Sequence, residues 1–124
     1  MKEEKENLID KIKRTNLFRG FKSIWNWIDV IWKDRQWDYS FFLLILIRKL
    51  ELMKKHIYSD DCCAYVGMEI DYENICKALD LAKRLYNDDY CLMYEDFKQC
   101  YEEKEKDLEE LFKIIRDNLT AWWD

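Results

Sequence analysis

The chain has 124 residues, of which 49% are apolar and 38% are charged, and its formal net charge is −5. These values describe a single domain-sized chain with enough apolar residues for a core, and they exclude a disordered or membrane-embedded protein. Proline is absent and glycine occurs twice, so few residues are suited to the tight turns of a sheet protein. We therefore predict an all-α fold, a single-domain bundle of four to five helices over residues 1–124.

Two helices are predicted in the first quarter of the chain. The first covers residues 3–14, with Leu8, Ile9 and Ile12 on one side. The second covers residues 17–33, where large apolar residues recur at alternating spacings of three and four. These residues are Phe18, Phe21, Trp25, Ile28 and Trp32. The second helix is therefore expected to have one continuous apolar stripe.

The third predicted helix, residues 39–57, contains the longest apolar run of the chain, FFLLILI. A helix that is apolar on all sides for two turns is normally the most buried one, so we expect this to be the buried central helix of the bundle. The carboxylate of Asp38, directly before it, is suited to accept hydrogen bonds from the first free amides of the helix. The run is far shorter than the roughly 20 residues that cross a membrane, so no membrane contact is expected.

Two further helices are predicted after a long break at residues 58–70. Within this break Gly67 is the expected left-handed position. The fourth helix covers residues 72–86, with Asp71 as its cap. The fifth helix is expected to run without interruption through residues 90–119.

Charge is distributed unevenly along the chain. Residues 1–55 contain 13 Lys/Arg and 8 Asp/Glu, a balance of +5, whereas residues 56–124 contain 8 and 18, a balance of −10. Either the two halves pack together and partly neutralise each other, or an acidic face binds a basic partner. The predicted acidic face comprises Asp88, Asp89, Glu95, Asp96, Glu102, Glu103, Glu105, Glu109 and Glu110.

Aromatic residues are unusually frequent, with six Trp, eight Tyr and six Phe. A core of this size does not easily contain all of them, although most are expected in the core or at its edge. Trp and Tyr are enriched in protein interfaces because each provides a large rigid contact with one polar group. We predict a partly exposed aromatic interface at Trp27, Trp37, Trp122 and Trp123.

Sequence motifs for catalysis or for metal binding are absent, as are Gly-rich phosphate loops and paired Cys motifs. The single histidine, His56, is expected to offset the dipole at a helix end, or alternatively to join Glu69 and Asp71 in a metal-dependent enzyme. Five cysteines without a signal sequence favour reduced thiols in the cytoplasm. We predict no enzymatic activity, no catalytic residue, no cofactor and no bound metal. Direct nucleic acid binding by the basic first helices is not expected either, because the whole chain is acidic.

Three segments of the chain, IWKDRQWDYSFFLLILIRKLELMKKH, YVGMEIDYENICKALDLAKRLYNDDY and LFKIIRDNLTAWWD, resemble a family of small all-helical proteins of tailed bacteriophages. The resemblance covers about residues 24–124, and the adjacent Cys62 and Cys63 depart from it. The matching residues are Trp32, Asp34, Trp37, Asp38, Lys49, Met53, Asp71, Arg84, Leu85, Trp122 and Trp123. The resemblance implies a virus-encoded protein in the cytoplasm of an infected bacterium and brings no catalytic residue with it.

These observations favour a non-enzymatic binding protein that docks on a host or defence-system macromolecule, as small phage inhibitors of CRISPR nucleases do. The acidic face would imitate the phosphates of a nucleic acid in the channel of a nuclease complex. One alternative is a homo-oligomer that sequesters a nucleotide signal between Trp25, Trp37 and Arg35. The other alternative is the metal-dependent enzyme named above.

Overall fold

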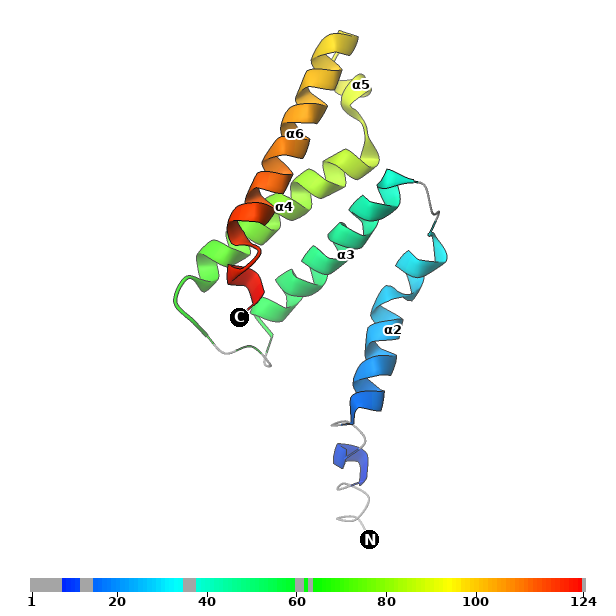
Figure 1. Ribbon diagram of the computed structural model, residues 1–124, viewed down its shortest axis with the longest axis vertical. Helices are drawn as coiled ribbons and strands as arrows, with labels where there is room; N and C mark the ends of the chain where they lie inside the picture. The colour runs from blue at the N-terminus through cyan, green and yellow to red at the C-terminus, as the bar shows by residue number, and fades with distance from the viewer. Residues whose placement is uncertain (1–7, 12–14, 35–37, 60–61, 63, 124) are drawn as a thin grey trace. The chain divides into compact units, whose positions relative to one another are not determined.

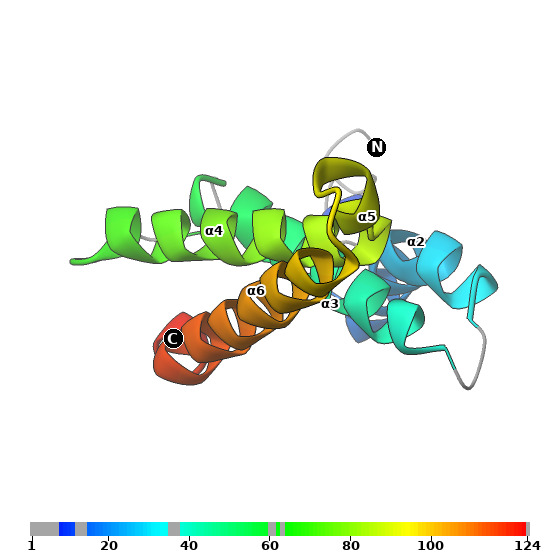
Figure 2. The same ribbon diagram turned by 90° about the horizontal axis from the view of Figure 1, so that it is seen from above.

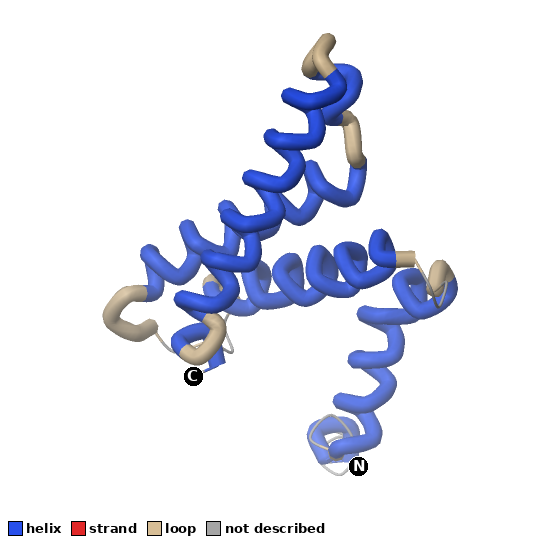
Figure 3. The backbone as a smooth tube through the Cα atoms, turned by 45° about the horizontal axis from the view of Figure 1, so that its top comes forward, coloured by secondary structure: helices blue, strands red, loops and turns tan. Residues whose placement is uncertain are grey.

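The computed structural model describes residues 8–11, 15–34, 38–59, 62 and 64–123. In these residues every regular element is a helix and no strand occurs (Figure 3), so the all-α prediction is confirmed. Residues 8–11 are helical, and the rest of the predicted helix 3–14 lies outside the described residues. The other elements are α2 (Asn16–Trp32), α3 (Tyr39–Ile57), α4 (Met68–Asn87), α5 (Tyr90–Met93), α6 (Phe97–Asn118) and the 3₁₀ turn η1 (Ala121–Trp123).

The chain divides into two compact units, residues 1–36 and residues 37–124, and each is described by itself. The first unit contains α2, and the second contains α3 to η1. The prediction of one domain over residues 1–124 stays a prediction. No helix in the described ranges is both long and apolar enough to cross a membrane.

The second unit is built around α4. Figure 1 shows α3 and α4 running side by side and α6 crossing α4, and Figure 2 shows the same crossing from above. Six side chains of α4 are buried, compared with four of α3. The prediction that α3 is the buried central helix is therefore wrong. The physical reason is that α4 packs on both α3 and α6. The apolar run of α3, by contrast, has apolar side chains on sides that α4 does not cover.

The hydrophobic core of the second unit lies where these helices meet. Leu50 from α3, Ile75 and Ala78 from α4, and Leu111 from α6 are almost completely buried. The core continues to α5 through Tyr90, and thirteen buried residues form one cluster. One contiguous core of this kind is the usual basis for a stable domain.

The beginnings of the helices explain where the predicted boundaries succeed and fail. As predicted, Asp38 caps α3, because its carboxylate accepts a hydrogen bond from the Ser40 amide at 3.0 Å. Gly67 is the left-handed residue, with φ of 90°, and it occupies the N-cap position of α4. Consequently α4 starts at Met68, and Asp71 lies inside the first turn instead of capping the helix.

The predicted helix 90–119 is interrupted at residues 94–96, so it forms two helices, α5 and α6. Tyr94 and Asp96 have extended backbones, with ψ of 132° and 122°. The Asp96 carboxylate accepts a hydrogen bond from the Lys98 amide at 3.1 Å and starts α6 as its N-cap. Asp side chains compete in this way with a continuous helix, because they offer its amides a local acceptor.

Candidate functional site

The largest exposed apolar surface of the first unit is one side of α2. Eight large side chains lie along this side, which we call the α2 stripe, and their exposed fractions run from 42% for Phe18 to 88% for Trp32. The members are Leu17, Phe18, Phe21, Ile24, Trp25, Ile28, Ile31 and Trp32. The predicted stripe therefore exists, and it faces solvent instead of forming a core.

The opposite side of α2, which we call its polar side, contains exposed charged residues, but it also contains the half-buried Trp27 and Val30, which is only 2% exposed. Its exposed residues include two cations, Arg19 and Lys22, and the neighbouring Ser23. Asp29 provides one negative charge on this side. An amphipathic helix of 17 residues is marginally stable alone in water, and most of its stability normally comes from packing of its apolar side. The α2 stripe is therefore the strongest candidate for a docking surface in this unit.

The predicted aromatic interface is only partly described. Trp27 on α2 and Trp122 in η1 are half-buried, and their role in an interface stays a prediction. Trp37 and the side chain of Trp123 lie outside the described residues. Trp25, which was predicted in the stripe and not in the aromatic interface, is 76% exposed. The proposed nucleotide site of Trp25, Trp37 and Arg35 falls largely on residues that are not described.

The nine predicted acidic residues do not all have the same role. Eight are exposed, whereas Glu103 is half-buried. Asp88 is the left-handed C-cap of α4 and forms an ion pair with Lys104 at 2.9 Å, and Asp96 caps α6. The remaining exposed carboxylates are Asp89, Glu95, Glu102, Glu105, Glu109 and Glu110.

The solvent side of α6 mixes both signs of charge. At 100° per residue, Glu102, Glu105 and Glu109 share the side opposite the core. Four exposed basic residues lie beside these glutamates, and one of them, Lys98, is 3.9 Å from Glu102. The four are Lys98, Lys106, Lys113 and Arg116. Because these basic residues lie among the glutamates, the negative potential at this surface is weaker than the net charge of residues 56–124 suggested. Binding of a partner by this acidic surface stays a prediction.

One carboxylate of α6 is buried and joins three helices. Asp107 is 7% exposed, and its Oδ2 accepts a hydrogen bond of 2.6 Å from the Tyr90 hydroxyl of α5. Its Oδ1 lies 3.2 Å from Nη2 of Arg84 on α4. Asp107 and Tyr90 are buried, whereas the Arg84 side chain is 54% exposed, so the network links α5 and α6 to the end of α4 at the edge of the core. Its role is structural, and sequence reasoning missed it because Asp107 stands in a run of charged residues.

Alkaline pH should weaken the fold through Tyr90. Burial, followed by the hydrogen bond to Asp107, raises the pKa of Tyr90 above the tyrosine value of 10.0. Its contribution to stability is therefore complete below about pH 10 and is lost as the pH rises through the folded-state pKa. Urea unfolding of the wild-type chain and of Tyr90→Phe should show a smaller alkaline loss in the variant. Equal losses above pH 10 would contradict this assignment.

The residues of the metal-dependent alternative do not form a metal site. Among the described residues, no group of three or more His, Cys, Asp and Glu side chains is placed to bind a metal ion. Nδ1 of His56 is 3.5 Å from the Ser59 hydroxyl at the end of α3, and Asp71 accepts a 2.9 Å hydrogen bond from the Tyr65 hydroxyl. Burial and this hydrogen bond raise the pKa of Tyr65 to about 12. His56 and Asp71 are thus bonded to separate neighbours.

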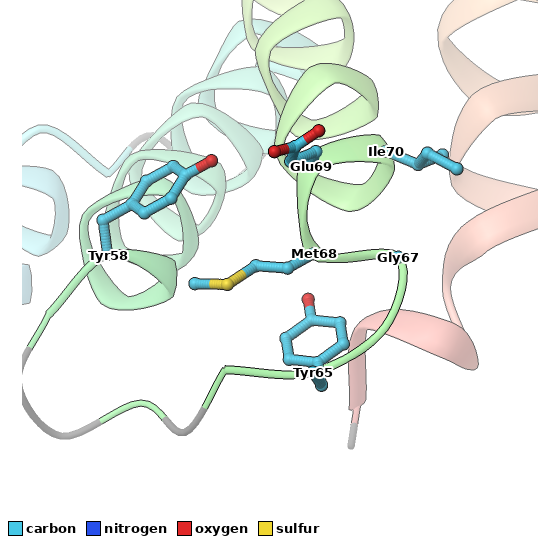
Figure 4. A pocket seen from close by; sticks show the side chains of 6 residues that line it. All are labelled: Tyr58, Tyr65, Gly67, Met68, Glu69 and Ile70. Carbon is cyan, nitrogen blue, oxygen red and sulfur yellow. The ribbon is translucent and has the colours of Figure 1, made fainter.

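A hollow of about 370 Å³ lies at the beginning of α4 (Figure 4). The Met68 side chain extends towards the rings of Tyr58 and Tyr65, whereas Ile70 points away from them. Gly67 and Glu69 complete the wall, and the left-handed Gly67 gives the loop its turn into α4. This hollow combines two phenol groups with one carboxylate, and its lining residues include no His, Cys or Lys.

A larger cavity of about 560 Å³, which we call the α3 cavity, lies in the second unit between α3, α4, α6 and η1. Tyr65 lines both this cavity and the hollow at α4. Its lining residues are Leu46, Lys49, Leu50, Leu52, Met53, His56, Ile57, Cys62, Tyr65, Ile75, Ile115, Leu119 and Trp122. Sequence reasoning did not identify this cavity, because its walls come from five separate segments.

Comparison of the chain with protein-family models, with curated proteins and with solved structures found no match. The resemblance to a bacteriophage family therefore stays a prediction from the sequence.

Proposed function

We propose that this chain is a non-enzymatic binding protein whose α2 stripe docks in an apolar groove of a partner protein. The observation that supports this most directly is the exposure of the stripe, which is 76% for Trp25 and 88% for Trp32. The eight side chains together present on the order of 1,000 Å² of apolar surface, comparable to what one partner buries in a standard interface. In the finer form of the proposal, the partner is a host or defence-system macromolecule of an infected bacterium.

The spacing of the stripe suits recognition as a helix in a groove. Phe21, Ile24, Trp25, Ile28 and Trp32 follow the pattern of i, i+3, i+4, i+7 and i+11 on one face. Helices bound in this way insert a few large anchors into pockets, and Trp is the commonest strong anchor.

Charge favours a protein groove with carboxylates at its rim. Residues 1–36 contain nine Lys/Arg and six Asp/Glu, a balance of +3, and residues 37–124 contain twelve and twenty, a balance of −8. The polar side of α2 has only Arg19 and Lys22 among the exposed cations within the helix, fewer than a helix that lies on an anionic membrane surface normally has.

A pair of neighbouring substitutions tests this proposal. Ile24→Asp places a charge in the stripe, and Ser23→Asp places the same charge on the polar side of the same turn. The tagged wild-type chain, expressed in bacteria, should capture a partner that mass spectrometry identifies. That partner, once purified, should bind wild-type and Ser23→Asp chains with equal affinity and bind Ile24→Asp at least a hundredfold more weakly, since a buried unpaired charge costs several kcal/mol.

Three results would overturn the proposal. If light scattering shows a wild-type dimer that Ile24→Asp converts to a monomer, the stripe is occupied by a second copy. If the wild-type chain binds anionic vesicles and Ile24→Asp does not, the occupant is a lipid surface. If the affinity for the purified partner falls steeply with added salt and is equal in both variants, the contact runs through the acidic residues of α6, as nucleic acid mimicry requires.

A further inference from the structure

We propose that the α3 cavity is a binding site for an amphiphilic carboxylate, a molecule with an apolar chain or ring system and one carboxylate group. The volume of the cavity, about 560 Å³, lies within the range of small-molecule sites in proteins, roughly 300 to 1,000 Å³. The site is separate from the α2 stripe, because every lining residue belongs to the second unit.

The interior of the cavity selects an apolar body. Leu50 and Ile75 belong to the buried core, and Met53 and Ile115 pack against it. Together with the leucines of the wall, these side chains offer a molecule almost no polar group along its length. Met53 is flexible and polarisable, so it can adapt to ligands of slightly different shape.

The polar groups of the cavity favour a negative charge. Lys49 and His56 lie on α3 seven residues apart, two turns along the same side of the helix, and both are exposed. None of the described residues that line the cavity is Asp or Glu. Leu119 is also exposed, and we call these exposed lining residues, Lys49, His56 and Leu119, the mouth of the cavity. A carboxylate at this mouth would therefore leave the apolar body of its molecule inside.

Trp122 supplies part of the cavity wall through its ring, since its Nε1 is fully buried and does not face the open space. The charged contact for a carboxylate therefore comes from Lys49, which lines the cavity and is exposed.

The test compares dodecanoate with dodecanol, which has the same chain and no charge. Calorimetric titration of the full chain, below the concentration at which dodecanoate forms micelles, should show saturable binding of one molecule. Lys49→Gln should weaken dodecanoate about fivefold, as expected for a partly exposed ion pair, and leave dodecanol unchanged. Lys55→Gln, on the same helix but outside the cavity, is the matched control and should change neither ligand.

Two further variants separate the cavity from other surfaces. Leu119→Trp should fill the mouth and abolish binding while circular dichroism remains that of the wild type. Ile24→Asp should leave dodecanoate binding unchanged, because the α2 stripe takes no part in it.

The proposal is overturned if dodecanoate does not bind saturably, or if Leu119→Trp binds it as well as the wild type. It is also overturned if Lys49→Gln and Lys55→Gln weaken it equally, which indicates general charge attraction. Loss of binding in Ile24→Asp would place the molecule on α2 and would likewise refute the cavity site. None of these results depends on whether a partner protein docks on the stripe.

Discussion

Replacing Asp107 by alanine should lower the free energy of unfolding by about 3 kcal/mol, one of the two largest effects expected from a single substitution. The Tyr90 hydroxyl would lose its acceptor in a buried position, and Arg84 would lose its ion pair. The Arg84 side chain is 54% exposed, so most of the loss is assigned to Tyr90. Urea unfolding followed by circular dichroism measures the change, and the midpoint of thermal unfolding should fall by roughly 10 °C.

Two controls separate the network from the general cost of a substitution in α6. Asp117→Ala removes an exposed carboxylate, 3.1 Å from Arg116, and should change stability by less than about 0.5 kcal/mol. The double variant Tyr90→Phe with Asp107→Ala should be more stable than the sum of the two single effects predicts, because both remove the same contact. Strictly additive effects would show that Tyr90 and Asp107 are not coupled.

Leu111→Ala should have a comparable effect, about 3 kcal/mol, for a different reason. The Leu111 side chain is fully buried in the core cluster, so its removal exposes no surface and leaves a cavity that its neighbours fill only partly. Leu108, one turn earlier on α6, is 36% exposed and provides the matched control. Urea unfolding should show a loss below about 1 kcal/mol for Leu108→Ala, and equal losses would contradict the assigned orientation of α6.

The helical class of the fold was predictable because its causes are local. The absence of proline, the scarcity of glycine and the carboxylate of Asp38 each act within a few residues of where they stand. The break before Asp96 depends on a competition between two local choices, a longer helix or a capped new one. Hydrophobic periodicity alone does not resolve that competition.

The central position of α4 and the site residues could not be predicted in the same way. Burial depends on which helices pack together, and the most apolar run, in α3, has sides that α4 does not cover: Phe42 is exposed although it stacks on Phe112 of α6. The α3 cavity likewise combines Lys49 with Trp122, which are far apart in sequence. Only periodic stripes, such as that of α2, can be read from the sequence, and even there the pattern does not reveal whether the stripe is covered.

The packing of α4 also has a consequence for the order in which the chain folds. α3 and α4 are neighbours in sequence and in space, so this helical hairpin can form while the rest of the chain is still being synthesised. The other side of α4 then remains uncovered until α6 leaves the ribosome. During that interval the α3–α4 hairpin of the nascent chain exposes the apolar surface that α6 later covers. This hairpin is therefore the species most prone to aggregate or to bind a chaperone.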